Sequence, residues 1–311
     1  MAGIAILIVT HNSETEIGGC LDAAAKAGVE ILVVDNGSTD GSLAEVSSRG
    51  VRVIANASNR GFAGAVNQGF EALDAPYILL LNPDAVIESS LEPLREACDL
   101  PAAAGAGGQL LDTAGHPQIG FMVRSFPTPA SLSLEALLLN RVWPNNPVNR
   151  KYRGLLLDYS TRLKVDQPAG AFLMIRRDVW RKLGGFDPGF FPIWFDDTDF
   201  CKRAADQGYH CYYVPQSVAR HTGAHSISKL PLEIRTVYWY GSFLRYSAKH
   251  FRPLAGRVVC LAVIAGSFLR IIADLASNRS LKSLAVYGRV VRLASRSLIC
   301  GRRDEVVPPG F

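Results

Sequence analysis

The sequence predicts an α/β fold, in which a mostly parallel, Rossmann-like sheet is flanked by helices. In the first hundred residues, short apolar strands alternate with helical segments, which is typical of parallel sheets with right-handed crossovers. The run Ile4–Val9 is apolar throughout, as expected of a strand buried on both faces. Hydrophobic residues make up 48% of the chain and charged residues 20%, a composition that indicates a globular core. Ligands of such sheets bind beyond the carboxyl ends of the strands.

Each element of the first half follows from a local pattern. Gly28 closes the first helix, and turn-forming residues occupy 36–42 before the second. In the third helix Phe62, Val66 and Phe70 recur at helical spacing. The expected strands are 4–9, 30–34, 51–54 and 77–81, and the expected helices are 16–27, 42–48 and 61–73.

The middle of the chain is less regular. Residues 102–108 are rich in small side chains and 126–149 contain four prolines, so we expect a variable excursion there with one short helix, 132–139. Regular structure is predicted to return in four later elements: a strand at 170–175, helices at 178–183 and 197–207, and a strand at 209–214.

Composition argues against several classes of protein. The net charge of +5 is too small to indicate nucleic-acid binding, and no nucleic acid is expected as a partner. The six cysteines show neither a C-x-x-C pair nor zinc-ligand spacing, which fits reduced thiols in the cytosol. The N-terminus enters a strand at once, without a basic region or a cleavage site, so we expect no signal peptide.

The segment 190–201 carries the strongest chemical signal. Its sequence, Phe-Phe-Pro-Ile-Trp-Phe-Asp-Asp-Thr-Asp-Phe-Cys, places Asp196, Asp197 and Asp199 directly behind a block of aromatics. Apolar rings reduce the solvation of a carboxylate, raise its pKa and make it a better base. The alternative is that these acids favour the first turn of a helix. Trp194 suits stacking on a sugar and burial in a core equally well.

Polar segments also follow the strands of the first half. They are Thr10-His11-Asn12-Ser13-Glu14, Asp35-Asn36-Gly37-Ser38-Thr39-Asp40, 59–67 and Asn82-Pro83-Asp84. Asp35 ends its strand and is placed to accept hydrogen bonds from a base or a ribose, whereas Asp40 and Asn12 have the residue types of helix caps. Gly61 allows close approach of a ligand and Arg60 suits phosphate, although glycine-rich loops also occur where a helix packs on a sheet.

In their order and spacing these segments resemble the nucleotide-sugar-binding half of family 2 glycosyltransferases, which have the GT-A fold. The resemblance continues through Gly184-Gly185-Phe186-Asp187, the aromatic-acid segment and His221, and thus covers roughly residues 3–225. The block Asn59-Arg60-Gly61-Phe62-Ala63-Gly64 is most similar to the rhamnosyltransferase-type branch of that family.

This resemblance implies roles for individual residues. It implies that the second acid of the Asp196-Asp197 pair is the catalytic base, while Asp196 caps the helix or holds the acceptor. The donor is expected against Thr10, Asn12, Glu14, Asp35, Asn36, Arg60, Gly61, Asn67 and Asn82. The acceptor is expected near Gly170, Ala171, Trp194 and Asp199.

The same resemblance implies a divalent cation, Mg²⁺ or Mn²⁺. Where the family typically carries Asp-x-Asp, this chain has Asn82-Pro83-Asp84, so one carboxylate and one amide remain. His221 follows a later strand, and in the family a histidine there can complete the metal site. A lone histidine is also often structural, and His225 is the weaker candidate.

The last eighty residues differ in composition from the rest. Between Arg252 and Arg303 there are ten Lys or Arg and one acid, Asp274. Residues 258–269 are apolar but bounded by arginines, too short a run for a membrane span of about 20 residues. A stripe at helical spacing follows, formed by Leu284, Tyr287, Val291, Ala294 and Leu298. Three arginines, at 289, 292 and 296, share the same spacing on another face. This predicts a basic amphipathic helix on anionic lipid, or alternatively a helix packed on the main domain.

Together these patterns predict an inverting glycosyltransferase at the cytoplasmic face of a membrane. We expect a GT-A domain over 1–229, with a nucleotide-sugar half (1–100) and an acceptor half (101–229), and a helical tail over 230–311. The donor is a nucleoside-diphosphate sugar, with dTDP-L-rhamnose favoured by resemblance, and the acceptor is lipid-linked or a polysaccharide of the cell envelope. Two alternatives remain. A sugar nucleotidyltransferase would carry Gly-x-Gly-Thr-Arg after the first strand, and a non-catalytic binding protein would not need both Asp84 and Asp197.

Overall fold

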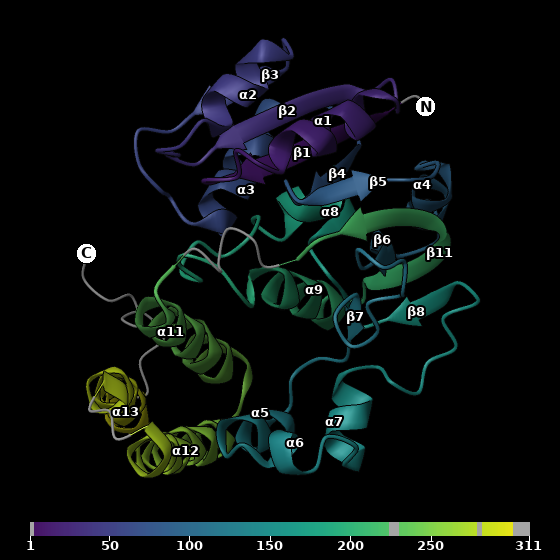
Figure 1. The fold of residues 1–311 in the computed structure, drawn as a ribbon. Helices are drawn as coiled ribbons and strands as arrows, with labels where there is room; N and C mark the ends of the chain where they lie inside the picture. The colour runs from purple at the N-terminus through teal and green to yellow at the C-terminus, as the bar shows by residue number, and fades with distance from the viewer. Residues whose placement is uncertain (1–2, 224–229, 279–281, 301–311) are drawn as a thin grey trace. The chain divides into compact units, whose positions relative to one another are not determined.

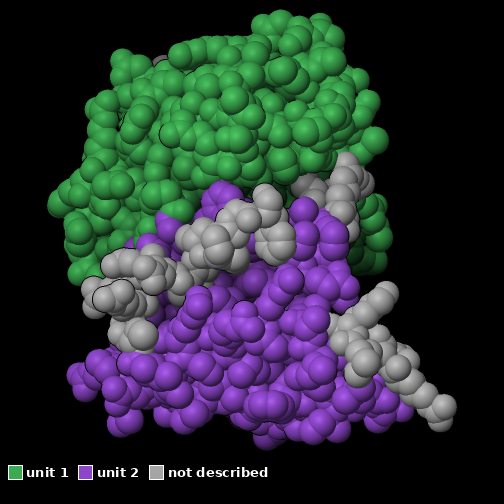
Figure 2. All heavy atoms as spheres, turned by 90° about the vertical axis from the view of Figure 1, so that its left-hand side faces the viewer, with its two compact units in different colours: residues 1–126, 153–188, 196–229 green, residues 127–152, 189–195, 230–311 purple. Residues whose placement is uncertain are grey.

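The computed structural model describes residues 3–223, 230–278 and 282–300. The chain divides into two compact units, coloured separately in Figure 2. Unit 1 comprises residues 1–126, 153–188 and 196–229, and unit 2 comprises residues 127–152, 189–195 and 230–311. The expected division at residue 230 coincides with the last of these boundaries. Two internal segments that the sequence assigned to the main domain, 127–152 and 189–195, group with unit 2 instead.

Unit 1 is built on a nine-stranded mixed sheet, which confirms the predicted α/β class (Figure 1). The strand order is β3-β2-β1-β4-β10-β6-β11-β5, and β8 pairs with β11. The first four strands of this order run parallel, whereas β10 is antiparallel to both β4 and β6. The bounds are β1 Ile4–Thr10, β2 Glu30–Asp35, β3 Arg52–Ala55, β4 Tyr77–Leu81, β5 Ala85–Ile87, β6 Ala103–Leu111, β8 Leu163–Val165, β10 Phe172–Arg176 and β11 His210–His221. A second, two-stranded sheet pairs β7 (Val123–Arg124) with β9 (Gln167–Pro168).

Helices cover both faces of the large sheet because its strands alternate their buried side chains. Ile6 and Ile8 of β1 pack in one cluster with α1 (Ile17–Ala25), α2 (Ser42–Ser48) and α4 (Glu92–Cys98). Ala5 and Leu7 point to the other cluster, with α3 (Phe62–Ala72), α8 (Arg177–Lys182) and α9 (Asp196–Asp206). The result is a three-layered core in which the parallel strands β1, β2, β3 and β4 end at one common edge.

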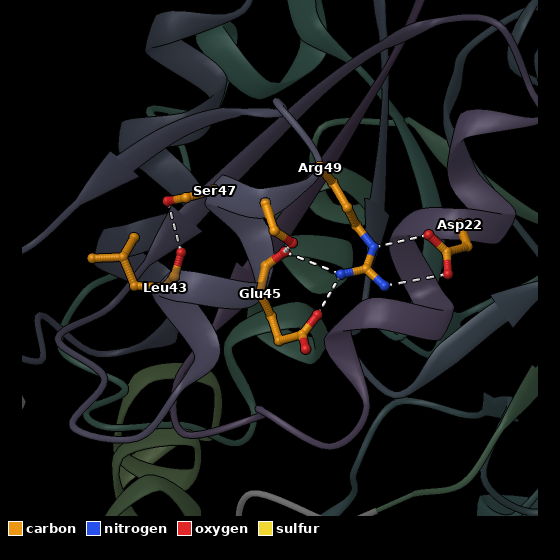
Figure 3. Close-up of polar contacts among 6 residues, drawn as sticks. Asp22, Leu43, Glu45, Ser47 and Arg49 are labelled. Atoms are coloured by element: carbon orange, nitrogen blue, oxygen red, sulfur yellow. Dashed lines mark hydrogen bonds and ion pairs between the residues drawn. The ribbon is translucent and has the colours of Figure 1, made fainter.

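Arg49, the residue after α2, links that helix to α1, as Figure 3 shows. Its Nε donates to Asp22 Oδ1 of α1 at 2.8 Å, and its Nη1 donates to the carboxylate of Glu45 one turn earlier in α2. Both acids and the arginine lie at the surface, so this network fixes the angle between the helices and adds little to stability.

Strand β6 was missed by the sequence analysis, which interpreted residues 102–108 as irregular. The structure places Ala103–Leu111 in the middle of the sheet, between β10 and β11. The small side chains follow from this position. A Cβ on Gly105 would collide with the backbone carbonyl of Met174, and one on Gly108 with the ring of Phe172. Low β propensity is overridden here because only glycine fits the close approach of neighbouring chains.

Strand β11 is longer than predicted. The sequence suggested an end at Val214, but the strand continues through a register shift between Val214 and Val218 and ends at His221. The added residues pair antiparallel with β5, so that His221 lies opposite Ala85. The irregularity in β11 thus brings a histidine next to residue 84, although 137 positions separate the two in the chain.

Unit 2 is helical. The predicted helix at 132–139 is displaced and divided into α5 (Pro129–Ala136) and α6 (Leu139–Val142), followed by α7 (Pro147–Tyr152). Three long helices follow: α11 (Leu232–His250), α12 (Pro253–Asn278) and α13 (Lys282–Cys300). Their shared core contains Phe190, Tyr240, Phe243 and Val263. In Figure 1 the colour bar identifies α12 and α13 as the yellow-green and yellow end of the chain.

Two expectations about the tail are corrected. The apolar run 258–269 does not stop at its arginines, because α12 continues through both, and Pro253–Ala276 is long and apolar enough to cross a membrane by length and composition. The apolar stripe of α13 is largely used inside the protein, since Tyr287, Ala294 and Leu298 pack in the core of unit 2. The arginines of α13 at 289, 292 and 296 are exposed, as expected.

Candidate active site

The site begins at the carboxyl ends of β1 and β2, where Thr10 and Asp35 are register partners. Both are buried, and Asp35 Oδ2 accepts a 3.1 Å hydrogen bond from the Ser38 amide. The hydroxyl of Thr10 and Oδ1 of Asp35 have no hydrogen-bond partner among the described residues. Buried polar atoms are rarely left unpaired, so these two oxygens are candidates for hydrogen bonds to a ligand.

The side chain of Asn36 is used within the protein. Its Nδ2 donates to Asn59 Oδ1 at 2.9 Å and to the Gly61 carbonyl at 3.2 Å, while its Oδ1 accepts from the Arg60 amide at 3.0 Å. Asn36 therefore shapes the loop 59–61, and its side chain supports a donor site instead of lining it. Gly61 has a φ of 75°, a conformation that favours glycine, and the Arg60 side chain is exposed.

Asn12 and Glu14 are likewise turned toward a neighbouring loop. Asn12 Oδ1 accepts from the Thr39 amide at 2.8 Å, and Glu14 Oε2 accepts from the Gly41 amide at 3.0 Å. Asp40 precedes Gly41, the N-cap of α2, and accepts a hydrogen bond from the Ser42 amide at 3.0 Å. These residues hold the loop 36–42 in place, so we revise the direct role in donor binding that was assigned to the Asn12 and Glu14 side chains.

Asn67 is a structural residue. Its Oδ1 accepts from the Phe186 amide at 2.8 Å, and its Nδ2 donates to the Phe186 carbonyl at 2.8 Å. The residue that interrupts the apolar face of α3 thus anchors the turn around Gly185-Phe186. Its expected role at the donor stays a prediction.

Asp84 and His221 meet where β5 begins and β11 ends. The distance from Asp84 Oδ1 to His221 Nε2 is 3.4 Å, and Asp84 Oδ2 accepts from the Gly223 amide at 3.0 Å. Burial alone would raise the pKa of the Asp84 carboxyl, but the hydrogen bond and charge of His221 and the Gly223 amide outweigh it and lower the pKa. Asn82 lies beside the pair, with Nδ2 3.4 Å from His221 Nε2.

Gln118 holds His221 from its other side and was not foreseen from the sequence. Its Nε2 donates to the His221 carbonyl at 2.8 Å, which leaves Oε1 facing His221 Nδ1 at 3.1 Å. An amide oxygen only accepts, so Nδ1 carries a proton, and Nε2 is the ring nitrogen directed at Asp84. The Phe121 ring stacks on the imidazole at 5.2 Å. A glutamine in an irregular stretch gives no signal of this role.

Asp197 opens α9 and is the partly exposed member of the three acids. Its Oδ2 accepts from Gln167 Nε2 at 2.9 Å and from the Gly170 amide at 3.0 Å. Its Oδ1 accepts from the Thr198 amide at 2.6 Å and lies 3.2 Å from the Thr198 hydroxyl. The carboxylate is therefore fixed in position. Of its two oxygens, Oδ1 is the one that contacts a hydroxyl, that of Thr198, which an acceptor hydroxyl could replace. The role of Gln167 had no signal in the sequence.

The other two acids have different environments. Asp196 is buried, burial together with the charge of Asp197 raises the pKa of its carboxyl well above the ordinary value, and its Oδ2 has no partner among the described residues. Asp199 is fully buried and pairs with Arg203 Nε at 2.8 Å. The carboxylate of Asp199 lies in the core of unit 1, and its expected acceptor role stays a prediction.

Backbone hydrogen bonds connect the Asp84 and Asp197 regions. The Asn82 amide donates to the Ala171 carbonyl at 3.0 Å, and the preceding residue, Gly170, donates to Asp197. Gly170 and Ala171 are buried. Their backbone groups bond to Asp197 and Asn82, so they help to position these two residues. Trp194 belongs to unit 2, has a φ of 78°, and its acceptor role stays a prediction. His225 lies outside the described residues.

Known proteins resemble this chain in sequence. The family model for glycosyl transferase family 2 matches residues 5–184, more than half of the chain, and a model for a glycosyltransferase-like family 2 matches residues 148–237. The N-acetylglucosaminyl-diphospho-decaprenol L-rhamnosyltransferase of Mycobacterium tuberculosis is 29% identical over 247 residues, 74% of this chain and 78% of that protein. Rhamnosyltransferase WbbL of Escherichia coli is 25% identical over 162 residues, 51% of this chain and 57% of that protein.

Solved structures resemble it in fold. The mannosyltransferase PcManGT from Pyrobaculum calidifontis, in complex with GDP-Man and Mn²⁺, superposes with a TM-score of 0.56 at 15% identity and covers 96% of this chain and 87% of that one. GalNAc-T7 with UDP, GalNAc and Mn²⁺ has a TM-score of 0.52 at 13% identity, covering 80% and 51%. The mixed sheet with acids at its edge therefore has the GT-A fold of sugar-transferring enzymes. The chain belongs to glycosyl transferase family 2, and it is a glycosyltransferase.

Proposed function

We propose that this enzyme is an inverting glycosyltransferase that moves L-rhamnose from dTDP-L-rhamnose to a lipid-linked or polysaccharide acceptor in cell-envelope glycan synthesis. The observation that carries the proposal is the environment of Asp197, a partly exposed carboxylate held by Gln167 and Gly170 at the carboxyl edge of the sheet. The names of the two rhamnosyltransferases quoted above support the donor and the acceptor class.

In the proposed reaction the acceptor hydroxyl attacks the anomeric carbon in line with the departing diphosphate. The new bond joins the acceptor oxygen to the anomeric carbon, the bond from that carbon to the phosphate oxygen breaks, and the nucleoside diphosphate leaves with its electron pair. The acceptor proton passes to the Asp197 carboxylate, where the acceptor hydroxyl would replace the Thr198 hydroxyl that lies 3.2 Å from Oδ1. A single displacement inverts the anomeric configuration.

Asp84 and His221 are the residues that would hold the divalent cation. His221 Nε2 and Asp84 Oδ1 face each other at 3.4 Å, so both could contribute to one cation site, with Nε2 binding the cation through its lone pair when unprotonated. Among the described residues no group of three His, Cys, Asp or Glu side chains is placed to bind a metal. The other ligands would be donor phosphates and waters, as is usual for Mg²⁺ and Mn²⁺ with few protein ligands. When bound, the cation neutralises charge on the leaving diphosphate.

The nucleoside is proposed to bind at Thr10 and Asp35, whose free oxygens meet the donors of a base or ribose. Arg60 and Gly61 would face the diphosphate. Asn82 is proposed to act from beside the cation, since its amide already lies against His221. Asn12, Glu14 and Asn36 keep the surrounding loops in place for this purpose.

The lipid-linked acceptor implies work at a membrane surface. We propose a cytoplasmic enzyme bound peripherally to the inner face of the cell membrane, because a polyprenyl acceptor is confined there. The exposed arginines of the tail support this location, since each basic residue near an anionic surface contributes about 1 kcal/mol.

A screen of nucleotide sugars tests the proposal. Thermal unfolding is measured with dTDP-, UDP- and GDP-sugars in the presence of Mn²⁺, and a true donor at a hundred times its Kd adds about 2.7 kcal/mol. The stabilising donor is then incubated with a polyprenyl-diphosphate sugar acceptor, and released nucleoside diphosphate is measured with and without EDTA. Stabilisation by a nucleotide sugar without sugar transfer to any acceptor would favour a non-catalytic binding protein. Release of pyrophosphate when the protein is incubated with a nucleoside triphosphate and a sugar 1-phosphate would favour a nucleotidyltransferase.

A further inference from the structure

We propose that one face of α12 inserts into the lipid interface and is the membrane-contacting element of this enzyme; the proposal rests on the proposed function and deepens it. We call this surface the α12 face. It consists of large apolar side chains that are between 39% and 74% exposed to solvent. They are Leu254, Val258, Leu261, Phe268, Leu269, Ile272 and Leu275. Large contiguous apolar surfaces are uncommon on soluble monomers and mark interaction sites.

The positions follow helical geometry. Leu254, Val258, Leu261, Phe268 and Ile272 recur at intervals of three, four or seven residues, so they lie along one side of the helix. The positions span about 30 Å at 1.5 Å per residue.

The opposite side of α12 is held by the protein. Val259 and Val263 are buried in the core of unit 2. Arg270 donates from Nη1 to the carbonyl of Ala136 in α5, and its guanidinium lies 5.8 Å from the rings of both Tyr240 and Tyr287. About two fifths of the most apolar stretch of α12 is buried in the protein. A helix that crosses a membrane alone exposes its whole circumference to lipid, whereas a helix bound along one side fits an orientation in the plane of the interface.

The charges near this face indicate anionic lipid. Arg252 and Arg257 are exposed at the start of α12, and α13, which packs on α12, exposes arginines at 289, 292 and 296. From Arg252 to Arg296, Asp274 is the sole acid in the sequence. Arginines beside an inserted apolar face are placed to contact lipid phosphates.

A second copy of the chain is the competing occupant, because the spacing also fits a coiled-coil seam. Such seams carry charged residues on both flanks, which set the pairing of the helices. Here one flank of the face consists of Ala255, Leu269 and Ala276, none of them charged, so the apolar surface is broader than a seam. We therefore assign the face to lipid.

Flotation of the full-length protein with vesicles tests the assignment. Vesicles of phosphatidylcholine, with and without about 30% phosphatidylglycerol, are used at low and high salt. A variant carrying Leu261→Ser, Phe268→Ser and Ile272→Ser is expected to lose at least about tenfold in vesicle binding. A matched control, Val142→Ser with Leu156→Ser, removes two apolar side chains that are 84% and 64% exposed elsewhere, and it should bind as the wild type does.

Oligomeric state and chemistry are measured on the same samples. Light scattering should give the same mass for wild type and triple variant, and turnover of a short-chain, water-soluble acceptor should be unchanged, since none of the three substituted residues has a proposed role in donor binding or catalysis. Vesicle binding that survives the triple substitution, or a wild type that binds no vesicles, overturns the proposal, as does a dimer that the variant converts to a monomer. Absence of sugar transfer with intact vesicle binding would refute the proposed function alone.

Discussion

Gln118 contacts His221 at two points, donating to its carbonyl oxygen at 2.8 Å and facing its Nδ1 with Oε1 at 3.1 Å. The first hydrogen bond fixes which way the amide points, and the second then requires a proton on Nδ1. The histidine thereby directs Nε2 at Asp84. A partner of this kind orients a metal ligand without touching the metal.

We expect Gln118→Leu to weaken Mn²⁺ binding by about 10- to 100-fold, because the imidazole loses its fixed tautomer. Titration of Mn²⁺ by electron paramagnetic resonance measures the affinity, and nitrogen chemical shifts of His221 report the tautomer in the metal-free protein. Gln216→Leu, at an exposed position of β11, is the matched control. In a His221→Ala background the Gln118 substitution should have no further effect. A full effect in that background would mean that Gln118 acts by another route.

Asp196→Asn is expected to retain turnover within several-fold, because the buried carboxyl of Asp196 already favours its neutral form, which asparagine imitates. The pKa of this group is raised on folding, so the folded state binds more protons than the unfolded state. Stability should therefore fall as the pH rises above the unfolded value of about 3.9 toward the folded pKa. Urea unfolding between pH 4 and pH 7 should show a smaller decline for the variant. Parallel curves for the two proteins would contradict this assignment.

Arg203→Leu is expected to lower the free energy of unfolding by about 3–5 kcal/mol, because it removes the positive charge beside the fully buried Asp199 carboxylate. Lys202→Leu is the control, since it breaks a neighbouring, more exposed pair with Asp206 that should contribute at most about 1 kcal/mol. Chemical denaturation gives both values. Equal effects from the two substitutions would show that Asp199 does not depend on Arg203.

The alternation of strands and helices in the first hundred residues was predictable because local patterns dominate there. The core of β1 and the apolar face of α3 appear directly in the spacing of their residues. Strand β6 was not predictable in this way. Its glycines reflect close contact with Met174 and Phe172, about seventy residues away in sequence, and such contacts leave no periodic pattern.

The site was predictable in its acids and not in its hydrogen-bond partners. Asp84 and Asp197 were found because they follow recognisable strand-end and helix-start patterns. The amides that fix them, Gln118 and Gln167, come from irregular or short segments that fold back from elsewhere. Conversely, we expected Asn67 to contact a ligand, because it interrupts the apolar face of α3. Its hydrogen bond to the Phe186 amide gives a structural reason for a polar residue at this position.

The turnover of Asp197→Asn tests the central claim most directly. Asparagine preserves the shape of the side chain but cannot take a proton from the acceptor hydroxyl. We expect unchanged donor affinity in a nucleotide-sugar binding assay and a loss of turnover of about 10²-fold or more. Near-normal turnover with intact donor binding would contradict the account and remove Asp197 from the role of general base.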